Sequence, residues 1–324
     1  DANSAAAYPQ ARLAFAEDWA LTAGLRWTWE RKQVQTGIAF DKTGILFRAA
    51  LGQEPYDESR ERRETDLSPR LALEYTWSPD FLLYAAAARG YKSGGYNDFA
   101  ATAEALEFAG ERLESVEAGF KAMLDERRMS LNLALFDSRL RDMQVSAYDG
   151  AAFYVQNAAA ARVRGAELES RWLMGSHWRG WASLGYLDAR YLSFPNAPVR
   201  SDQSGDTQDL GGQPLTHAPR LSGGGGLEYE WPIGALRLTA GLDALYRSLT
   251  YLNLDDDPQD AQPAYTVLNA ALVLAGAEDR WSLRLNVLNL TDKKYYDALM
   301  PSDGGRAVPG LGRTFLATLN YRFR

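Results

Sequence analysis

The sequence predicts an all-β fold, a transmembrane antiparallel up-and-down β-barrel, here an incomplete barrel of about 13 strands. Three observations support this prediction. Apolar residues recur with a period of two, aromatic residues gather at the ends of the apolar faces, and short and long connections alternate along the chain. Such strands can cross a membrane without any long apolar run.

The alternation is clear in residues 20–30, ALTAGLRWTWE, where Leu21, Leu25 and Trp27 share one face while Arg26 and Glu30 share the other. It recurs in segments 70–77, 115–124, 236–246 and 314–323. We expect one face to meet lipid and the other to line a polar lumen. The residues expected toward lipid are Trp27, Leu73, Phe120, Leu238 and Leu285, and those expected toward the lumen are Arg26, Glu74, Lys121, Arg237 and Arg284.

Aromatic pairs such as Trp27 with Trp29 and Tyr75 with Trp77 end these apolar faces, as a membrane-interface girdle requires. Alternation alone leaves open a soluble sandwich with one wet face per sheet.

The predicted strands are 8–17, 20–32, 67–77, 81–92, 111–124, 128–146, 152–173, 178–191, 215–231, 235–250, 263–276, 280–292 and 309–323.

Connection lengths favour the barrel over the sandwich. The short connections are ED, SPD, DER, GSH, PIG and AED, and the long ones are roughly 33–66, 93–110, 192–214, 251–262 and 293–308. A short–long alternation places every tight turn at one end of the strands and every long loop at the other. Outer-membrane barrels are built this way, whereas Greek keys and propellers are not.

Composition excludes some classes of function. The net charge is −7, which argues against a nucleic-acid partner because such a partner calls for a basic face. The chain has no cysteine, which suits passage through an oxidising periplasm. No apolar stretch approaches the roughly 18 residues of a membrane helix. The start, DANSAAAYPQ, has no basic region or apolar core of a signal peptide.

Several motifs resemble the barrels of TonB-dependent outer-membrane receptors. They are ARGYKSGGYN (88–97), ERLESVEAGFKAML (111–124) followed by LNLALFDSRLRDMQV (131–145), NAAAARVRGAELESRW (157–172), LNVLNLTDKKYYD (285–297) and LATLNYRF (316–323). They occur in the order of the family and cover nearly the whole chain. The resemblance therefore identifies residues 1–324 as a single barrel domain, the C-terminal part of such a receptor.

The resemblance implies a barrel of about 22 strands in the bacterial outer membrane, filled by a plug. It implies active import of a scarce cargo: a ferric siderophore or similar chelate, cobalamin, haem or a glycan. The partners would be outer-membrane lipid and an energy-transducing TonB-type protein that acts through a plug segment, which we expect to lie outside this chain. The alternatives are a plug-less passive pore or a degenerate remnant and, from another class, an outer-membrane hydrolase.

No catalytic site, cofactor or metal site is predicted. The two histidines, His177 and His217, fall in a tight turn and at the start of a strand, with no nucleophile and acid placed beside them. The acidic stretch LDDDPQD, with Asp255, Asp256, Asp257 and Asp260, is expected to be a solvated loop tip rather than a calcium site. Arg62 and Arg63 are expected in a self-paired, solvated loop. The glycines of GGGG, 223–226, are expected to relieve crowding within a strand.

Aromatic and polar residues near the outside rim are the candidate ligand-binding residues. Tyrosine offers a flat apolar body and a polar tip, which suits a polyaromatic or sugar cargo. For each residue taken singly, interface anchoring or loop packing is the alternative explanation. The candidates are Tyr91, Lys92, Tyr96, Asn97, Tyr148, Tyr154 and Tyr251.

Overall fold

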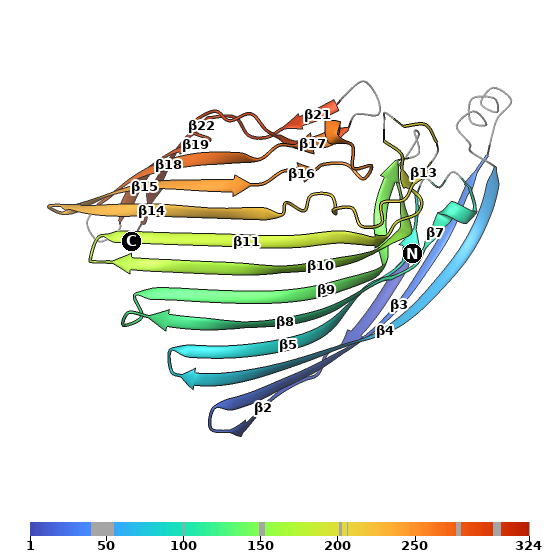
Figure 1. Cartoon of the computed structure of the whole chain (residues 1–324), viewed down its shortest axis with the longest axis horizontal. Helices are drawn as coiled ribbons and strands as arrows, with labels where there is room; N and C mark the ends of the chain where they lie inside the picture. The colour runs from blue at the N-terminus through green and yellow to red at the C-terminus, as the bar shows by residue number, and fades with distance from the viewer. Residues whose placement is uncertain are drawn as a thin grey trace.

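The computed structural model describes residues 1–39, 55–98, 100, 102–148, 153–200, 203–205, 207–276, 280–300 and 306–323, without the side chains of 147, 148, 153, 158, 300 and 306. A single curved antiparallel sheet dominates the fold (Figure 1). Within the described residues, no helix is long and apolar enough to cross a membrane.

The strands of this sheet follow one another in chain order. They are β1 (Ala2–Ala7), β2 (Gln10–Ala16), β3 (Trp19–Ile38), β4 (Tyr56–Ser78), β5 (Phe81–Lys92), β8 (Glu111–Leu124), β9 (Met129–Tyr148), β10 (Phe153–Met174), β11 (Trp178–Ser193), β14 (Leu221–Ile233), β15 (Leu236–Arg247), β18 (Tyr265–Ala275), β19 (Trp281–Leu288) and β22 (Thr314–Tyr321). From β3 onward each pairs with its neighbours in this series, and β1 and β2 both pair with β3, so the predicted up-and-down antiparallel topology is confirmed.

Short elements occupy the loops. They are the strands β6 (Gly95–Tyr96), β7 (Glu107–Phe108), β12 (Ala197–Pro198), β13 (Thr207–Gln208), β16 (Thr250–Tyr251), β17 (Ala261–Gln262), β20 (Tyr296–Met300) and β21 (Arg306–Pro309), with the 3₁₀ turns η1 (Glu104–Leu106) and η2 (Pro258–Asp260).

The predicted first strand is divided into β1 and β2, which pair with successive parts of β3. Pro9 lies at the break, and proline has no N–H to donate to a ladder. Counting β1 and β2 as one interrupted strand gives the predicted series of about 13 crossings. The predicted edges are also found, because among the described residues no ladder joins β22 to β1 or β2 and the sheet stays open.

The predicted loop 33–66 is wrong over part of its length. β3 continues to Ile38 and β4 begins at Tyr56, and the two pair without a break from Trp19↔Tyr75 to Ile38↔Tyr56. The charged residues of this hairpin carry both signs and pair within it, as Arg31 does with Glu61 at 2.8 Å and Arg60 with Glu58 at 3.1 Å, which suits a strand that projects beyond the apolar part of the sheet. Arg62 and Arg63 therefore lie in a strand rather than a loop.

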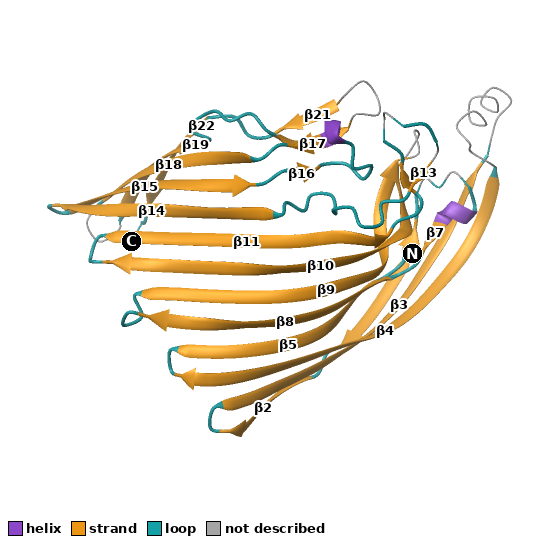
Figure 2. Cartoon of the chain, in the orientation of Figure 1, coloured by secondary structure: helices purple, strands orange, loops and turns teal. Residues whose placement is uncertain are grey.

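Several predicted strands were too long, among them 309–323, of which only Thr314–Tyr321 forms β22. β14 begins at Leu221 instead of 215, and β19 ends at Leu288 because the next residue, Asn289, adopts φ 51° in a turn. Short turns join the strands at one end of the sheet, and long loops join them at the other end (Figure 2). Positive φ angles at Asp125, Glu126 and Arg127 close one such turn, and Gly175 and Gly234 close two others.

Strand register confirms that the two predicted sets of residues lie on opposite faces of the sheet. Leu73 lies opposite Leu21 and Ala85, and that row continues through Ala118 and Leu135. All five residues predicted to face lipid share this side of the sheet, here called the outer face. All five predicted to face the lumen share the other side, here called the inner face.

The glycine run 223–226 leaves room on the inner face for Trp181. A Cβ at Gly226 would collide with Trp181 Nε1, and a Cβ at Gly224 would lie 3.0 Å from the same indole ring. Both glycines lie in β14, beside β11, which carries Trp181. The run therefore admits a large side chain next to the strand, in keeping with the expected relief of crowding.

The two faces predict different responses to one added charge. Leu184 is 55% exposed on the outer face, so Leu184→Arg should lower the free energy of unfolding by about 2–4 kcal/mol in a bilayer. Glu169→Arg, an exposed inner-face position, should cost less than about 1 kcal/mol. Denaturant unfolding of the full-length protein in lipid vesicles measures both. Equal losses would contradict the assignment of the faces.

Candidate ligand-binding surface at the loop end

The connection between β5 and β8 is fastened to the projecting β3–β4 hairpin. Arg62 donates to Glu64 and, at 2.6 Å, to Glu107 in the connection. Glu64 also accepts from the Gly94 amide at 3.0 Å and from the Tyr91 hydroxyl. With an exposed side-chain fraction of only 19%, Arg62 is a structural cross-link, in contrast to the solvated arginine that the sequence suggested.

Lys32 and Gly94 also help to hold the β5–β8 connection against the hairpin. Lys32 Nζ of β3 donates to Ser93 Oγ and to the Gly94 carbonyl oxygen, both at 2.6 Å. A Cβ at Gly94 would collide with the carbonyl oxygen of Phe108 and lie 2.8 Å from Arg62 Nε. Only glycine lets the backbone pass this closely. The segment that follows β5 is thus held in one place at the loop end.

Asn97 is a structural residue of the loop. Its side chain is 6% exposed. Its Nδ2 donates to the carbonyl oxygens of Ala105 and Val155 at 2.8 and 2.9 Å, and its Oδ1 accepts from the Val155 amide at 2.8 Å. Because these contacts use both donors of its amide and one lone pair of its oxygen, Asn97 ties the loop to β10.

Tyr96, unlike Asn97, has a side-chain polar group that is not hydrogen-bonded among the described residues. Its hydroxyl is buried and has no hydrogen-bond partner within the described part of the chain. Burial raises the pKa of Tyr96, so the hydroxyl stays protonated and can donate. An unpaired buried hydroxyl costs about 1–3 kcal/mol, which a bound acceptor would recover. Nearby, Lys92 is exposed and Tyr154 is partly buried at the start of β10.

Tyr251 belongs to a second group of loops. It lies in β16, and its carbonyl oxygen accepts from the His217 amide at 2.9 Å. The side chain of Tyr148 lies outside the described residues. The structure therefore brings Tyr91, Lys92, Tyr96, Asn97 and Tyr154 to one loop cluster and places Tyr251 in another. Whether any of them binds cargo stays a prediction.

The acidic segment 255–260 is buried, so the prediction of a solvated tip is wrong. Asp255, Asp256, Asp257 and Asp260 are all 8% exposed or less. Asn253 Nδ2 reaches the carboxylates of Asp255 and Asp260 at 3.3 and 3.2 Å. Asp257 caps η2 by accepting from the Gln259 amide at 2.9 Å.

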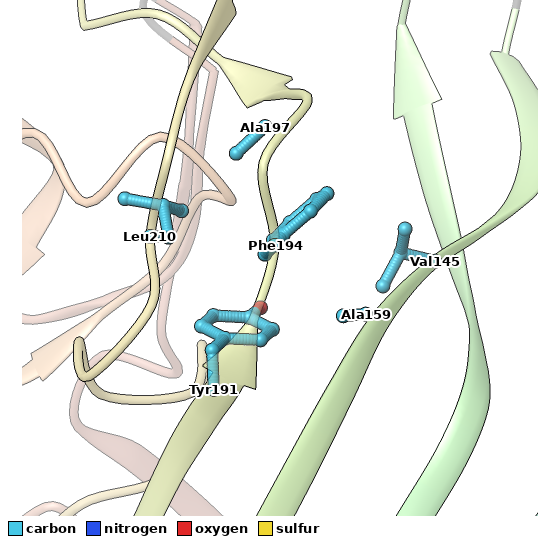
Figure 3. Close-up of a cluster of buried hydrophobic side chains, with 6 residues drawn as sticks. All are labelled: Val145, Ala159, Tyr191, Phe194, Ala197 and Leu210. Atoms are coloured by element: carbon cyan, nitrogen blue, oxygen red, sulfur yellow. The ribbon is translucent and has the colours of Figure 1, made fainter.

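A small apolar core explains why this segment is buried. Tyr191 and Phe194 are at most 1% exposed and pack with Val145, Ala159, Ala197 and Leu210 (Figure 3). Leu254, directly before the acidic segment, packs against the same core. Gln208 Nε2 also donates to the Asp255 carbonyl oxygen at 2.7 Å. In the sequence, the sign of this arrangement was Leu252 and Leu254 between the polar residues. That pattern is too short to distinguish a buried segment from a solvated one.

Burial raises the pKa of Asp255 and of Asp256 to about 6, and the neighbouring carboxylates add to the effect. Neither carboxylate oxygen of Asp256 has a hydrogen-bond partner within the described residues. The described part of the chain contains no group of three or more acidic or histidine side chains arranged to hold a metal ion. Burial therefore favours the protonated form of Asp255 and Asp256 more than it would be favoured in an exposed aspartate.

The histidines are not brought together. His177 lies in the turn between β10 and β11, where its Nδ1 is 2.8 Å from Ser176 Oγ. His217 lies at the loop end beside Tyr251. The two positions are at opposite ends of the sheet, so these histidines cannot share one catalytic site.

The comparisons with known proteins agree with this geometry. The model of the family "TonB dependent receptor-like, beta-barrel" matches residues 1–290. The chain belongs to this family, whose barrels are proteins of the bacterial outer membrane.

Individual relatives are more distant. The chain is 26% identical to the Probable TonB-dependent receptor BfrD of Bordetella pertussis over 95% of this chain and 39% of that protein. It is 26% identical to the Metal-pseudopaline receptor CntO of Pseudomonas aeruginosa PAO1 over 96% of this chain and 40% of that protein. The ferric yersiniabactin uptake receptor FyuA of Yersinia pestis shares the fold, with a TM-score of 0.81 and 20% identity over 100% of this chain and 46% of FyuA. The chain thus spans about two fifths of the length of these curated relatives.

The acidic cluster predicts that the stability of its loop falls, rather than rises, as the pH increases. A carboxyl whose pKa is raised from 3.8 to about 6 on folding binds its proton more tightly in the folded state. Stability of the loop is therefore full below about pH 4 and falls as the pH rises through 6. At pH 7.5, Asp256→Asn should raise the free energy of local opening of residues 252–262 by about 1–3 kcal/mol and so slow their amide exchange. At pH 4.5 the variant should change this exchange little.

Hydrogen exchange measured by mass spectrometry on the full-length protein tests this expectation. Asp209→Asn serves as a control, because Asp209 only accepts from the nearby Gly211 amide in an exposed turn. If the Asp256 variant exchanged faster than the parent protein at pH 7.5, the carboxylate would be stabilising and the account of the cluster would be wrong.

Proposed function

We propose that this chain is the C-terminal part of the barrel of an outer-membrane receptor that binds a metal chelate, such as a ferric siderophore, and imports it with energy from a TonB-type partner. Membership of the TonB-dependent receptor family carries the proposal. The plug, and further strands that pair with the open edges at β1, β2 and β22, would lie outside residues 1–324. An open edge in lipid would leave backbone groups unsatisfied at several kcal/mol each.

A metal chelate is the cargo class that relatives support best. CntO is named as a receptor for metal-pseudopaline, and that cargo class is carried over here as a proposal. The chemistry of the loop end is compatible with it. Tyr96 and Lys92 offer a hydroxyl donor and a cation to the oxygen atoms of a chelate.

The proposed receptor binds and transports, and it carries out no bond cleavage. The relatives are named as receptors, and the described histidines lie at opposite ends of the sheet. A plug-less pore would pass small solutes without energy, so coupling to a TonB-type partner separates the two possibilities.

Uptake by living cells tests the proposal. A strain without this receptor should grow poorly when a single ferric siderophore is the iron source, and the full-length gene should restore growth only when the TonB-type partner is present. Haem, cobalamin and glycans, given one at a time, test the other cargo classes. Restoration that does not depend on the partner would indicate a passive pore.

Tyr96→Phe separates a ligand-binding role from loop packing. If Tyr96 donates to the cargo, removing its hydroxyl should weaken cargo binding by about 5- to 10-fold, since one such hydrogen bond contributes about 1 kcal/mol. If Tyr96 only packs, the variant should bind normally and be slightly more stable, because an unpaired buried hydroxyl is lost. Titration calorimetry gives the affinity. Tyr229→Phe, at the turn end of β14, is the matched control.

A further inference from the structure

The ladder between β4 and β5 stops before either strand ends. The last pair toward the loop end is Arg70↔Ala88. Beyond it, β4 stays paired with β3 and β5 stays paired with β8 up to their loop ends. We call the boundary between residues 56–69 of β4 and 89–92 of β5 the seam. Among the described residues, no backbone–backbone hydrogen bond crosses it.

Pro69 lies where the seam begins, one residue beyond the last pair. Proline has no N–H to donate, so it is a natural place for a ladder to end. Past this point β3 and β4 form a two-stranded unit, residues 26–38 and 56–68, which we call the hairpin arm. The arm diverges from β5 at the loop end (Figure 1) and pairs with β1 along its other edge.

Side chains close the seam in place of the backbone. Arg89 Nη2 of β5 donates to Asp66 Oδ1 of the arm at 2.8 Å, and the Asp66 side chain is only 2% exposed. Farther out, the Tyr91 hydroxyl and the Gly94 amide both bond to Glu64 of the arm. The stretch RGYKSG, 89–94, thus supplies the groups that reach across to β4.

The closed seam carries a cost as well as a gain. Arg62 Nε and Arg89 Nε are buried at the seam and have no hydrogen-bond partner within the described residues. An unpaired buried donor costs free energy of the same order as a charge-assisted hydrogen bond contributes. A continuous backbone ladder would carry no such penalty. The closed and open arrangements of the seam are therefore closer in free energy than those of the paired strands around it.

The position of the arm also determines the position of Tyr96. Arg62 of the arm donates to Glu107 of β7 at 2.6 Å, and Glu107 is the register partner of Tyr96 in the β6–β7 pair. Movement of the arm away from β5 would break this contact together with those to Glu64. The β6–β7 pair, which carries the buried Tyr96 hydroxyl, would then lose its support on one side.

We propose that the hairpin arm opens and closes along the seam, and that the 89–94 segment is a latch that holds it closed with Glu64 and Asp66 as its acceptors. Glu64 and Asp66 are positioning residues for Tyr96 and do not themselves contact cargo. The link to cargo binding rests on the proposed function, whereas the motion of the arm does not.

Double electron–electron resonance on the full-length receptor in lipid vesicles, without cargo, tests the latch. Spin labels are attached at Ser59→Cys on the arm and Ser146→Cys on β9, two exposed positions on opposite sides of the seam. The parent protein should give one main distance. Glu64→Gln/Asp66→Asn should increase the population at longer distances by about fivefold or more, because the charge-assisted hydrogen bonds across the seam are lost.

Arg63→Gln is the matched control. Arg63 lies on the same arm, is 66% exposed and pairs with Glu61 of its own strand, so its loss should leave the distances unchanged. A charge exchange tests the Arg89–Asp66 contact by itself: Arg89→Asp should open the seam, and Arg89→Asp/Asp66→Arg should close it again in part. Unchanged distances in the Glu64/Asp66 variant, or equal changes in the Arg63 control, would overturn the latch.

Calorimetric titration with the ferric siderophore that supports growth tests the positioning role. The Glu64/Asp66 variant should bind it about fivefold more weakly or worse, while Arg63→Gln should bind like the parent protein. Tyr96→Phe should leave the spin-label distances unchanged, which separates loss of a contact from loss of position. Equal affinity of the parent and the Glu64/Asp66 variant would overturn the positioning role. The distances are measured without cargo, so failure of the latch and failure of the proposed transport function remain distinguishable.

Discussion

The backbone hydrogen-bond ladder is the constraint on which the rest of this structure depends. A strand that crosses lipid must find partners for every N–H and C=O, because hydrocarbon offers none. The ladder joins each strand to the next from β3 to β22, with irregularities in β4 and β10, and Pro9 lies at the break in the first strand. Once the ladder fixes the register, alternation of side chains decides which residues meet each face. The period of two in the sequence is therefore the direct expression of the ladder.

The same register carries the sheet beyond its apolar part and positions the loops. β3 and β4 continue as a charged hairpin, and its residues Lys32, Arg62 and Glu64 hold the β5–β8 connection. On the far side of the loop end, Tyr191 and Phe194 gather a second set of loops and bury four aspartates. A regular scaffold thus supports two ordered loop clusters of different chemistry: one offers a hydroxyl and a cation, and the other holds four buried carboxyl groups.

Sequence alone was sufficient for the fold class, the strand order and both faces, because each depends on local alternation and on connection length. It failed where tertiary contacts override local pattern. The dense charges of residues 56–66 resemble a polar loop, although these residues pair with β3. Asp255 to Asp260 look solvated because nothing in their own composition reveals the core formed by Tyr191 and Phe194, about 65 residues earlier in the chain. The hydrogen bond from Asn97 to Val155, 58 residues later, is also a tertiary contact that local pattern does not reveal.

Site-directed spin labelling of the full-length receptor in lipid vesicles tests the central claim most directly. Single cysteines are placed at successive positions of β4, β9 and β15, and their collision rates with oxygen and with a water-soluble nickel chelate are compared. A membrane-spanning barrel predicts that oxygen accessibility peaks at every second residue, at Leu73, Leu133 and Leu242, and that chelate accessibility peaks at the residues between them. Equal accessibility to the water-soluble chelate on both faces would mean that the sheet does not cross a bilayer and would contradict the account.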